Sequence, residues 1–590
     1  MEIERDIKWE PVTGNLLTRW SKEVNPEQPL PEYPRPQLKR KEWLNLNGLW
    51  DYSIRPKDEE TVSSFEGKIL VPFPLESALS GVKGKLRSRQ RLWYRRKFRI
   101  PSLWKNKNTL LHFGAVDWET RVWINDKEVG SHKGGYISFS FDITEYVKND
   151  MENNLVVAVW DPTNKGGQGR GKQVLRPGVV FYTAISGIWQ TVWLEPVPKT
   201  YIKRITVEPD TDNECIKLSL AIQNLQNVEE IYIEVKDKNN IISAVKERIG
   251  KTFLIPIPSP KLWSPENPFL YDLIITLKKE NTVVDKIESY FGMRTISLGD
   301  EQNGIRTVLL NNEELFQYGT LDQGYWPDGL YTAPTDSALK YDIEITKKLG
   351  FNLIRKHVKV EPARWYYHCD KIGVLVWQDM PSGGAAIGSR NIEEFKETRK
   401  VSDQSDFCNE LTEMVKMLFN HPSIIMWVPF NEGWGQFKTK EVCEKIRNMD
   451  SLRLINAASG WTDFGVGDIC DRHNYPNPVI PNSNEFKSRA YVIGEFGGLG
   501  LEVENHMWKI KNKFGYRNID DAVKLTRTYS RLISKLKKLI TKGACAAIYT
   551  QITDVEGEVN GLLTYDREII KMNEDELREI NKSLFTHYKN

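Results

Sequence analysis

The last half of the chain alternates short apolar runs with amphipathic stretches, and this alternation constrains the fold more than any other feature. Between the runs lie segments such as "DSALKYDIEITKKLG" and "CNELTEMVKMLFN", in which apolar residues recur as on one face of a helix. Eight buried strands that alternate with helices predict a (β/α)8 TIM barrel. The eight runs with strand character are "LFQYGT", "FNLIRKH", "GVLVWQDM", "SIIMWVPFNE", "RLINAASG", "DICDRHNYP", "AYVIGEFGG" and "CAAIYTQITD".

The first half of the chain predicts two domains that are built of β-strands only. From Trp43 to Glu195, segments such as "TLLHFGAV" and "NNLVVAVWD" alternate apolar and polar residues between turns, which is typical of an antiparallel sandwich. In "INDKEVG" the Asn-Asp pair predicts a tight hairpin. The joint "EPVPKT" leads into a smaller region whose strand spacing suits an immunoglobulin-like sandwich. We set the domains at 1–198, 199–297 and 298–590.

The composition argues against nucleic acid and membranes as partners. The net charge is only +3 with 27% charged residues, so the chain has no strong field of either sign. No stretch approaches the roughly 18 uninterrupted apolar residues of a membrane-spanning helix.

The N-terminus and the cysteines predict a reducing, cytoplasmic location. The segment "MEIERDIKWEPVTGN" lacks the apolar core of a signal peptide, so we expect a cytoplasmic protein if the sequence is complete. The six cysteines show no Cys-x-x-Cys spacing, and we expect reduced thiols. We predict neither a cofactor nor a metal site.

Two glutamates fall at the ends of predicted barrel strands. Glu432 ends the fourth run, in "NHPSIIMWVPFNEGWG", and Glu495 ends the seventh, in "YVIGEFGGLG". Because active sites of such barrels lie at the C-terminal ends of the strands, we expect the two carboxylates to face each other across the barrel mouth. Glycoside hydrolysis needs such a pair, since one group protonates the leaving oxygen while the other attacks the anomeric carbon or activates water.

The same motifs carry a family resemblance. "NHPSIIMWVPFNEGWG" resembles the acid/base signature of glycoside hydrolase family 2, which holds β-galactosidases, β-glucuronidases and β-mannosidases, and "IGEFGG" resembles its nucleophile motif. "SGIWQTVWLE", residues 186–195, is similar to the strand that closes the family's first domain. The resemblance covers nearly the whole chain and implies a jelly-roll sugar-binding domain, an immunoglobulin-like sandwich and a catalytic TIM barrel.

The resemblance also assigns roles to residues at the strand ends. It implies that Glu432 is the general acid/base and Glu495 the nucleophile of a retaining double displacement. Asn431 resembles the residue that binds the 2-hydroxyl of the sugar, and its alternative reading is a turn-forming asparagine. Tyr475, at the end of the sixth strand, would donate to Glu495, unless it only packs on Pro476.

Five further residues are candidates for the site, and all but Arg355 have a structural alternative. His473 contacts the sugar or is a satisfied core histidine. Asp161 matches the position from which some β-galactosidases send an aspartate of the first domain into the site, although a turn aspartate before proline explains it almost as well. Arg355 would lie inside the barrel and pair with the surroundings of the nucleophile. Trp434 and Trp377 would stack on a sugar face or pack in the core.

The chain departs from the family pattern in the substrate pocket. After the second strand the galactosidase and glucuronidase branches have arginine, two residues, then His-Tyr-Pro, whereas this chain has "RKHVKV", so Lys356 or His357 would do a related job. The eighth strand offers Tyr549 and Gln551 instead of a tryptophan, and Asp379 ends the third strand. The barrel half also lacks the Asn-x-Lys pair that marks uronic-acid recognition in glucuronidases. The pocket has therefore diverged while the catalytic pair has not.

We therefore predict a retaining exo-glycosidase that acts on a terminal β-linked sugar in a small oligosaccharide or glycoside. The resemblance favours a β-galactoside, with a β-glucuronide, β-mannoside, β-galactofuranoside or α-arabinofuranoside as alternatives. A carbohydrate-binding protein with a degenerate barrel is the alternative of another class, and the intact glutamates argue against it. The sequence leaves the oligomeric state open, a homo-oligomer included. We expect the loops 382–405 and 497–518 to shape the cleft.

Overall fold

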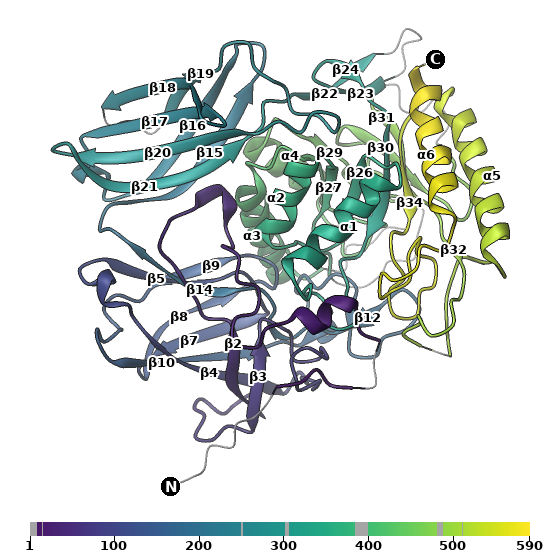
Figure 1. Cartoon of the computed structure of the whole chain (residues 1–590). Helices are drawn as coiled ribbons and strands as arrows, with labels where there is room; N and C mark the ends of the chain where they lie inside the picture. Colours follow the sequence, from purple (N-terminus) through teal and green to yellow (C-terminus); the bar gives the residue numbers. More distant parts are fainter. Residues whose placement is uncertain are drawn as a thin grey trace.

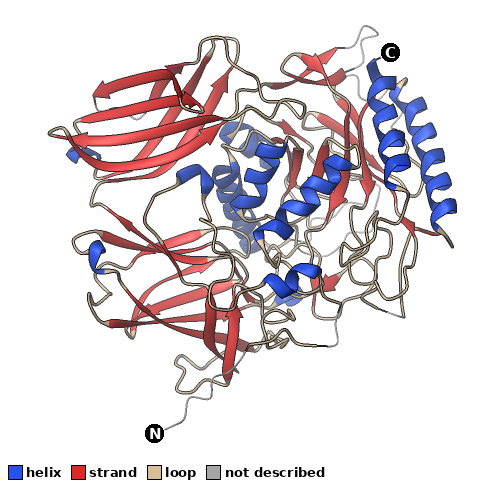
Figure 2. Ribbon diagram, in the orientation of Figure 1, coloured by secondary structure: helices blue, strands red, loops and turns tan. Residues whose placement is uncertain are grey.

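Two strand-rich units lie beside a third unit in which helices surround strands (Figures 1 and 2). A computed structural model of the chain describes residues 9–13, 16–248, 250, 252–300, 306–383, 399–480, 488–509 and 511–589. The predicted order of two β-sandwiches followed by a barrel is confirmed. The boundaries at 198 and 297 stay a prediction.

The first unit packs a six-stranded sheet on a four-stranded sheet. Alternating residues of the two sheets, among them Trp50, Leu92 and Leu111, share one apolar cluster between the layers. The six-stranded sheet has the order β3-β2-β4-β10-β7-β8, with strands β2 (Gly48–Pro56), β3 (Gly67–Val71), β4 (Gln90–Arg99), β7 (Glu119–Ile124), β8 (Lys127–Lys133) and β10 (Glu152–Trp160). The four-stranded sheet has the order β1-β14-β5-β9, with strands β1 (Leu44–Asn45), β5 (Asn108–Phe113), β9 (Phe139–Asp142) and β14 (Val192–Val197).

The predicted hairpin joins β7 to β8. Asn125 and Asp126 have φ of 50° and 66°, both in the left-handed region. This is the conformation of a two-residue type I′ turn, which asparagine and aspartate tolerate better than other non-glycine residues. The turn sets the register in which Ile124 pairs with Lys127.

The second unit packs a three-stranded sheet on a four-stranded sheet, as predicted for a small sandwich. Its apolar cluster includes Ile216, Ile233 and Ile275 from facing strands. The orders are β15-β16-β19 and β18-β17-β20-β21. The strands are β15 (Tyr201–Asp210), β16 (Cys215–Gln223), β17 (Glu230–Asp237), β18 (Asn240–Arg248), β19 (Thr252–Pro256), β20 (Tyr271–Lys279) and β21 (Thr282–Phe291).

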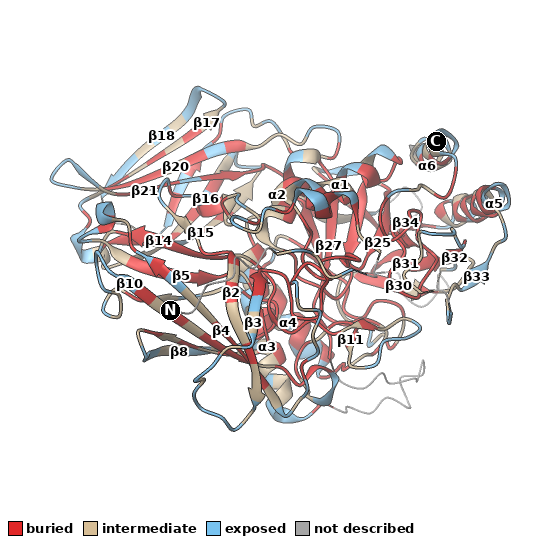
Figure 3. Cartoon of the chain, turned by 60° about the horizontal axis from the view of Figure 1, so that its bottom comes forward, coloured by how far each residue is buried: buried red, intermediate tan, exposed pale blue. Residues whose placement is uncertain are grey.

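The barrel contains all eight predicted strands. They pair in parallel in the order β29-β28-β27-β26-β25-β34-β31-β30, and Figure 3 shows them as the buried part of the unit. Parallel strands of this kind are covered on both faces, and this burial explains why their sequences are almost continuously apolar. The strands are β25 (Gln317–Asp322), β26 (Leu353–Lys356), β27 (Leu375–Asp379), β28 (Ile424–Val428), β29 (Leu454–Ile455), β30 (Ile469–His473), β31 (Ala490–Gly497) and β34 (Ala544–Thr550).

Helices cover the outer face of the barrel after most strands. The N-terminus of α1 is capped by Thr335, which accepts the Ala338 N–H at 3.1 Å, and α2 ends at Gly373, whose φ is 79°. Residues 456–468, between β29 and β30, form no helix, so strict alternation fails there. The α-helices of the described residues are α1 (Asp336–Lys348), α2 (Ala363–Ile372), α3 (Val401–Leu418), α4 (Thr439–Met449), α5 (Ala522–Ile540) and α6 (Glu574–Lys589).

A small sheet closes the end of the barrel opposite the predicted site. It consists of β22 (Ile296–Asp300), β23 (Arg306–Leu310) and β24 (Glu313–Glu314). Val308 and Leu310 share an apolar cluster with Leu353, the first residue of β26, and with Trp377 inside the barrel. The barrel interior is therefore packed from below and open for chemistry only at the C-terminal ends of its strands.

No helix in the described part of the chain combines the length and apolar character that crossing a membrane requires. All six cysteines are unpaired, as predicted. The cytoplasmic location stays a prediction.

A buried carboxyl group of the barrel lies against the first domain. Glu410 of α3 is 5% exposed, and a Cβ on Gly134 of the first domain would lie 3.2 Å from its Cγ. Burial raises the pKa of Glu410 to about 8, although the Gly135 N–H and Arg399 favour the ionised form. The folded protein therefore keeps this carboxyl group protonated at neutral pH.

The stability of this interface should fall with rising pH because of Glu410. Its pKa is raised above the ordinary 4.5, so its contribution is complete below about pH 4.5 and is lost as the pH rises through about 8. Glu410→Gln, which stays neutral, should be more stable than wild type at pH 9 by roughly 2 to 4 kcal/mol and similar at pH 5. Thermal melts at both pH values measure this, with exposed Glu413→Gln of the same helix as control. An equal pH dependence of wild type and Glu410→Gln would contradict the assignment.

Candidate active site

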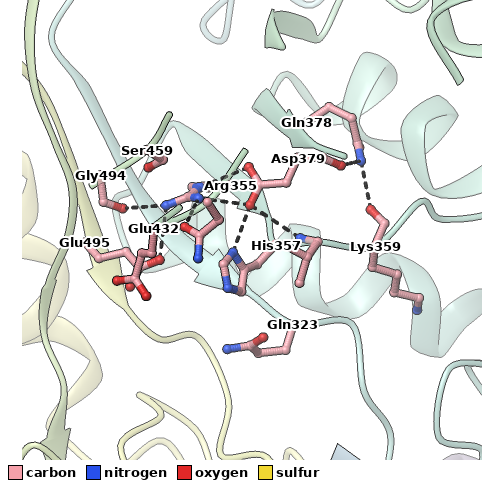
Figure 4. A network of polar contacts seen from close by, with 12 residues as sticks. Gln323, Arg355, His357, Lys359, Gln378, Asp379, Glu432, Ser459, Gly494 and Glu495 are labelled. Carbon is pink, nitrogen blue, oxygen red and sulfur yellow. Dashed lines mark hydrogen bonds and ion pairs between the residues drawn. The ribbon is translucent and has the colours of Figure 1, made fainter. Parts of the chain in front are cut away.

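The barrel brings the two predicted carboxylates together at the C-terminal ends of its strands (Figure 4). Glu495 lies in β31, and Glu432 lies shortly after β28. The Glu432 N–H donates to the Ser459 carbonyl at 2.8 Å, which holds a left-handed turn in which Glu432 has a φ of 52°. A carboxylate oxygen of Glu432 lies within 4.8 Å of one of Glu495. Retaining glycosidases have carboxyl groups about 5 to 5.5 Å apart, whereas inverting pairs stand roughly 6.5 to 9.5 Å apart.

Donors surround the buried Glu495 carboxylate. The Tyr475 hydroxyl donates to Oε2 at 2.5 Å, and Arg355 Nη1 donates to Oε1 at 3.2 Å. Burial alone would raise the pKa of Glu495, but the neighbouring His473 and Arg355 together have the larger, opposite effect and lower it to about 2. Glu495 is therefore ionised at neutral pH, as a nucleophile must be.

His473 stands between the two carboxylates. Its Nδ1 lies 2.8 Å from Glu432 Oε1 and 3.5 Å from Glu495 Oε2, while its Nε2 lies 2.8 Å from Ser459 Oγ. Burial lowers the pKa of His473, yet Glu495, Asp471 and Glu432 raise it above its usual value. The Nδ1–H is thus held toward Glu432, and the histidine is neither solvated nor packed in apolar core.

Arg355 ties the parts of the site together (Figure 4). Its Nε and Nη2 donate to the two oxygens of Asp379, each at 3.0 Å. Nη2 also donates to Asn431 Oδ1 at 2.8 Å. Because the carbonyl of Asn431 is occupied by Arg355, its amide hydrogens remain for another acceptor.

His357 shares Asp379 with Arg355. Its Nδ1 lies 2.8 Å from Asp379 Oδ2. Burial, with the charges of Lys172 and Arg355, holds the pKa of His357 well below its usual value. The ring is therefore neutral, with Nδ1–H donating to Asp379 and Nε2 left as an acceptor.

Trp434, a predicted wall residue, and Gln551, which the eighth strand offers in place of a tryptophan, both have protein partners. Trp434 stacks on Phe181 of the first domain, with ring centroids 5.3 Å apart. Gln551 accepts from Gln323 at 3.0 Å and donates to Glu558 at 2.7 Å and to Asn560 at 3.0 Å. Both amide hydrogens of Gln551 are therefore used within the protein.

Two residues predicted to bind substrate point out of the barrel instead. Lys356 follows the inward Arg355 and pairs with Asp322 at 2.5 Å and with Glu361 at 2.9 Å. Tyr549 packs between β34 and α5, where its ring lies 5.0 Å from that of Tyr529. Both predictions are wrong for one reason, because successive side chains of a strand alternate between the two faces of the sheet.

Two more residues predicted to contact the substrate, Trp377 and Asp161, lie too far from the two carboxylates. Trp377 points into the barrel, but it lies two residues before Asp379, is fully buried and donates to Gln317 at 2.8 Å. It is a core residue, as its alternative reading stated. Asp161 accepts the Thr163 N–H at 2.6 Å and the Ser186 hydroxyl at 2.9 Å within the first domain, so it does not reach the carboxylates.

Several residues at the barrel mouth escaped the sequence analysis. Phe181 comes from the segment 163–184 of the first domain, and Tyr516 stacks on Tyr475 with ring centroids 3.6 Å apart. Tyr516 lies in the second predicted loop, whereas residues 384–398, most of the first predicted loop, lie outside the described residues. The glycine-rich stretch "KGGQGRGK" could have indicated that this segment of the first domain packs closely against the barrel, because glycines permit close approach of two backbones.

Glu432, His473 and Glu495 also form a group, within the described residues, whose ligand atoms could hold a metal ion. Arg355 already provides positive charge beside Glu495. A metal-free site therefore stays our prediction.

Three family models match the chain in the order of its domains. The sugar binding domain of glycosyl hydrolases family 2 matches residues 71–198, the family's central model matches 200–294, and its TIM barrel domain matches 332–490. The chain belongs to glycosyl hydrolases family 2. The family resemblance drawn from the strand-end motifs is thus confirmed.

Relatives within the family carry two kinds of name. A β-galactosidase of Thermoanaerobacter pseudethanolicus is 31% identical over 75% of this chain and 57% of its own length. A β-glucuronidase of Bacteroides fragilis is 26% identical over 78% of this chain and 62% of its own length. The chain thus spans only about 60% of the length of these relatives.

Solved structures share the fold over nearly the whole chain. A β-D-glucuronidase of Dictyoglomus thermophilum superposes with a TM-score of 0.73 at 20% identity, covering 93% of this chain and 98% of that one. A β-galacturonidase of Eisenbergiella tayi, bound to galacturonate, gives 0.71 at 20% identity over 93% and 99%. At this identity the likeness establishes the three-domain fold.

The contact between Tyr475 and Glu495 gives a matched pair of variants. Tyr475→Phe removes a hydrogen bond to a charged acceptor and should lower kcat for an aryl β-glycoside by about 10- to 100-fold. Tyr549→Phe makes the same chemical change on the outer face of the barrel and should alter kcat by less than about twofold. Steady-state kinetics on both variants test the assignment, and an equal loss in the two would contradict it.

Proposed function

We propose that the chain is a retaining exo-glycosidase that hydrolyses terminal β-linked sugars by double displacement. The observation that carries the proposal is the facing pair Glu432 and Glu495, with oxygens within 4.8 Å. Membership of glycosyl hydrolases family 2, and relatives named β-galactosidase and β-glucuronidase, support the same class of reaction.

In the first step, ionised Glu495 attacks the anomeric carbon while Glu432 gives a proton to the departing glycosidic oxygen. The product is a covalent glycosyl-enzyme ester and the free aglycone. His473 Nδ1 occupies only Oε1 of Glu432, so Oε2 is available to carry the proton. The low pKa of Glu495 supports its role as nucleophile.

In the second step, Glu432 takes a proton from water, and the resulting hydroxide attacks the anomeric carbon. The ester bond breaks and Glu495 leaves as a carboxylate, with the original anomeric configuration restored. Asn431, oriented by Arg355 through its carbonyl, would donate to the 2-hydroxyl, a contact that strengthens in the oxocarbenium-like transition state.

Two sugars are candidates for the substrate. The sequence motifs favour a β-galactoside, and a relative named β-galactosidase supports it. Relatives and structural neighbours named β-glucuronidase or β-galacturonidase support a β-hexuronide. A degenerate binding barrel has little support, because it has no use for a buried, ionised Glu495 held by Arg355 and Tyr475.

Removal of the nucleophile tests the proposal. Glu495→Ala should lower the hydrolysis of a p-nitrophenyl β-glycoside by about 10⁴-fold or more. Azide should restore turnover by filling the space of the lost carboxylate, and the product should be the α-glycosyl azide, identified by NMR.

Glu432→Gln is the matched variant of the acid/base. It should slow alkyl glycosides by about 10²- to 10⁴-fold, and aryl glycosides with good leaving groups less, because those need little protonation. Wild-type rates in Glu495→Ala, or equal losses for both leaving groups in Glu432→Gln, would sink the assignment.

A further inference from the structure

A segment of the first domain brings a buried cation to the barrel mouth. The Gly171 N–H donates to the Ser382 carbonyl, after β27, at 2.9 Å. A Cβ on Gly171 would lie 2.6 Å from the carbonyl oxygen of Val358, after β26. The backbone of Lys172 is fixed from the other side, since its carbonyl accepts the Tyr182 N–H at 3.0 Å. Lys172 thus sits between two loops that carry site residues.

Lys172 is a buried residue, only 7% exposed. Its Nζ lies 5.7 Å from the centroid of the Tyr182 ring, and within the described residues it makes no hydrogen bond and no ion pair. Within the described residues, its Nζ is not a fully enclosed atom. An acceptor on a ligand can therefore reach the ammonium group.

The ammonium group of Lys172 is electrostatically coupled to groups of the site. Its positive charge acts on three groups, Glu495, His357 and Glu558, which lie on the barrel and on the loop after β34. The first two line the site around Arg355. The ammonium charge therefore acts on groups of the active-site mouth.

The two carboxylates near Lys172 are already bonded elsewhere. Glu495 accepts from Arg355 and Tyr475. Glu558 accepts from the Tyr182 hydroxyl at 2.8 Å and from Gln551 at 2.7 Å. Neither forms an ion pair with Lys172, so the position for an anion beside this ammonium remains available to a ligand.

We propose that Lys172 of the first domain binds the carboxylate of an acidic sugar, which makes the substrate a β-linked hexuronide. This inference rests on the proposed function, because it concerns the sugar held beside Glu495. A neutral sugar would leave the ammonium unpaired, whereas a carboxylate completes it with a charge-assisted hydrogen bond. Lys172 would thus serve the purpose of the Asn-x-Lys pair that the barrel half lacks, from a different domain.

The assignment predicts a loss that depends on the charge of the substrate. Lys172→Met should lower kcat/KM for p-nitrophenyl β-glucuronide and β-galacturonide by about 10- to 100-fold. The loss for the β-galactoside and β-glucoside should be at least about fivefold smaller, because for a neutral sugar Lys172 acts only through its charge near Glu495. Lys172→Arg should keep part of the hexuronide activity. Lys165→Met, an exposed lysine of the same segment, is the matched control. An equal loss for charged and neutral sugars would overturn the inference, and the ratio of the two hexuronides identifies the epimer.

A binding measurement separates this inference from the proposed function. Calorimetric titration of the full chain with D-glucuronate and D-galacturonate should give tighter binding than D-glucose, and Lys172→Met should lose that difference while its melting temperature stays close to wild type. If no glycoside is hydrolysed but hexuronate binding depends on Lys172, the catalytic proposal fails, and only the carboxylate-binding role of Lys172 stands. If neither hexuronate binds more tightly than glucose, the inference fails whatever the turnover.

Discussion

The buried guanidinium of Arg355 is the interaction on which the site depends. A fully buried cation is tolerated only when anions and hydrogen-bond acceptors surround it. Asp379 binds it through two bonds, Glu495 through one, and Asn431 through its carbonyl. One side chain of β26 thereby fixes residues from β27, β31 and the turn after β28. It helps to keep Glu495 ionised and occupies the carbonyl of Asn431. The charge balance of the core thus also sets the geometry of the proposed catalytic residues.

The mouth of the barrel is completed by the first domain rather than by the barrel alone. Phe181 stacks on Trp434, two residues after Glu432, and Lys172 lies between the loops that follow β26 and β27. Under our proposals, substrate selection is therefore divided between two domains. The barrel supplies the two proposed catalytic carboxylates and their charge balance, and the sandwich supplies an aromatic ring and a cation that makes no hydrogen bond or ion pair within the described residues.

The fold and the meeting of Glu432 and Glu495 at the barrel mouth could be predicted from sequence because both are local signals. Strand and helix periodicity is written in consecutive residues, and a glutamate at the end of an apolar strand must lie at one end of a parallel barrel. Lys356 and Tyr549 were misassigned because neighbours of inward residues face outward, and strand phase had not been fixed for them. Lys172 was missed for a different reason. Its position depends on contacts between two domains, and no periodicity within its own segment records them.

The central claim is that Glu495 forms a covalent bond to the sugar. A 2-deoxy-2-fluoro-β-glycosyl fluoride slows the second step more than the first, so the ester should accumulate on wild-type protein. Peptide mass spectrometry after proteolysis should then find one added glycosyl group on the peptide that contains Glu495, and none on the peptide that contains Glu432. A label on Glu432, or inactivation without a label on Glu495, would contradict the account.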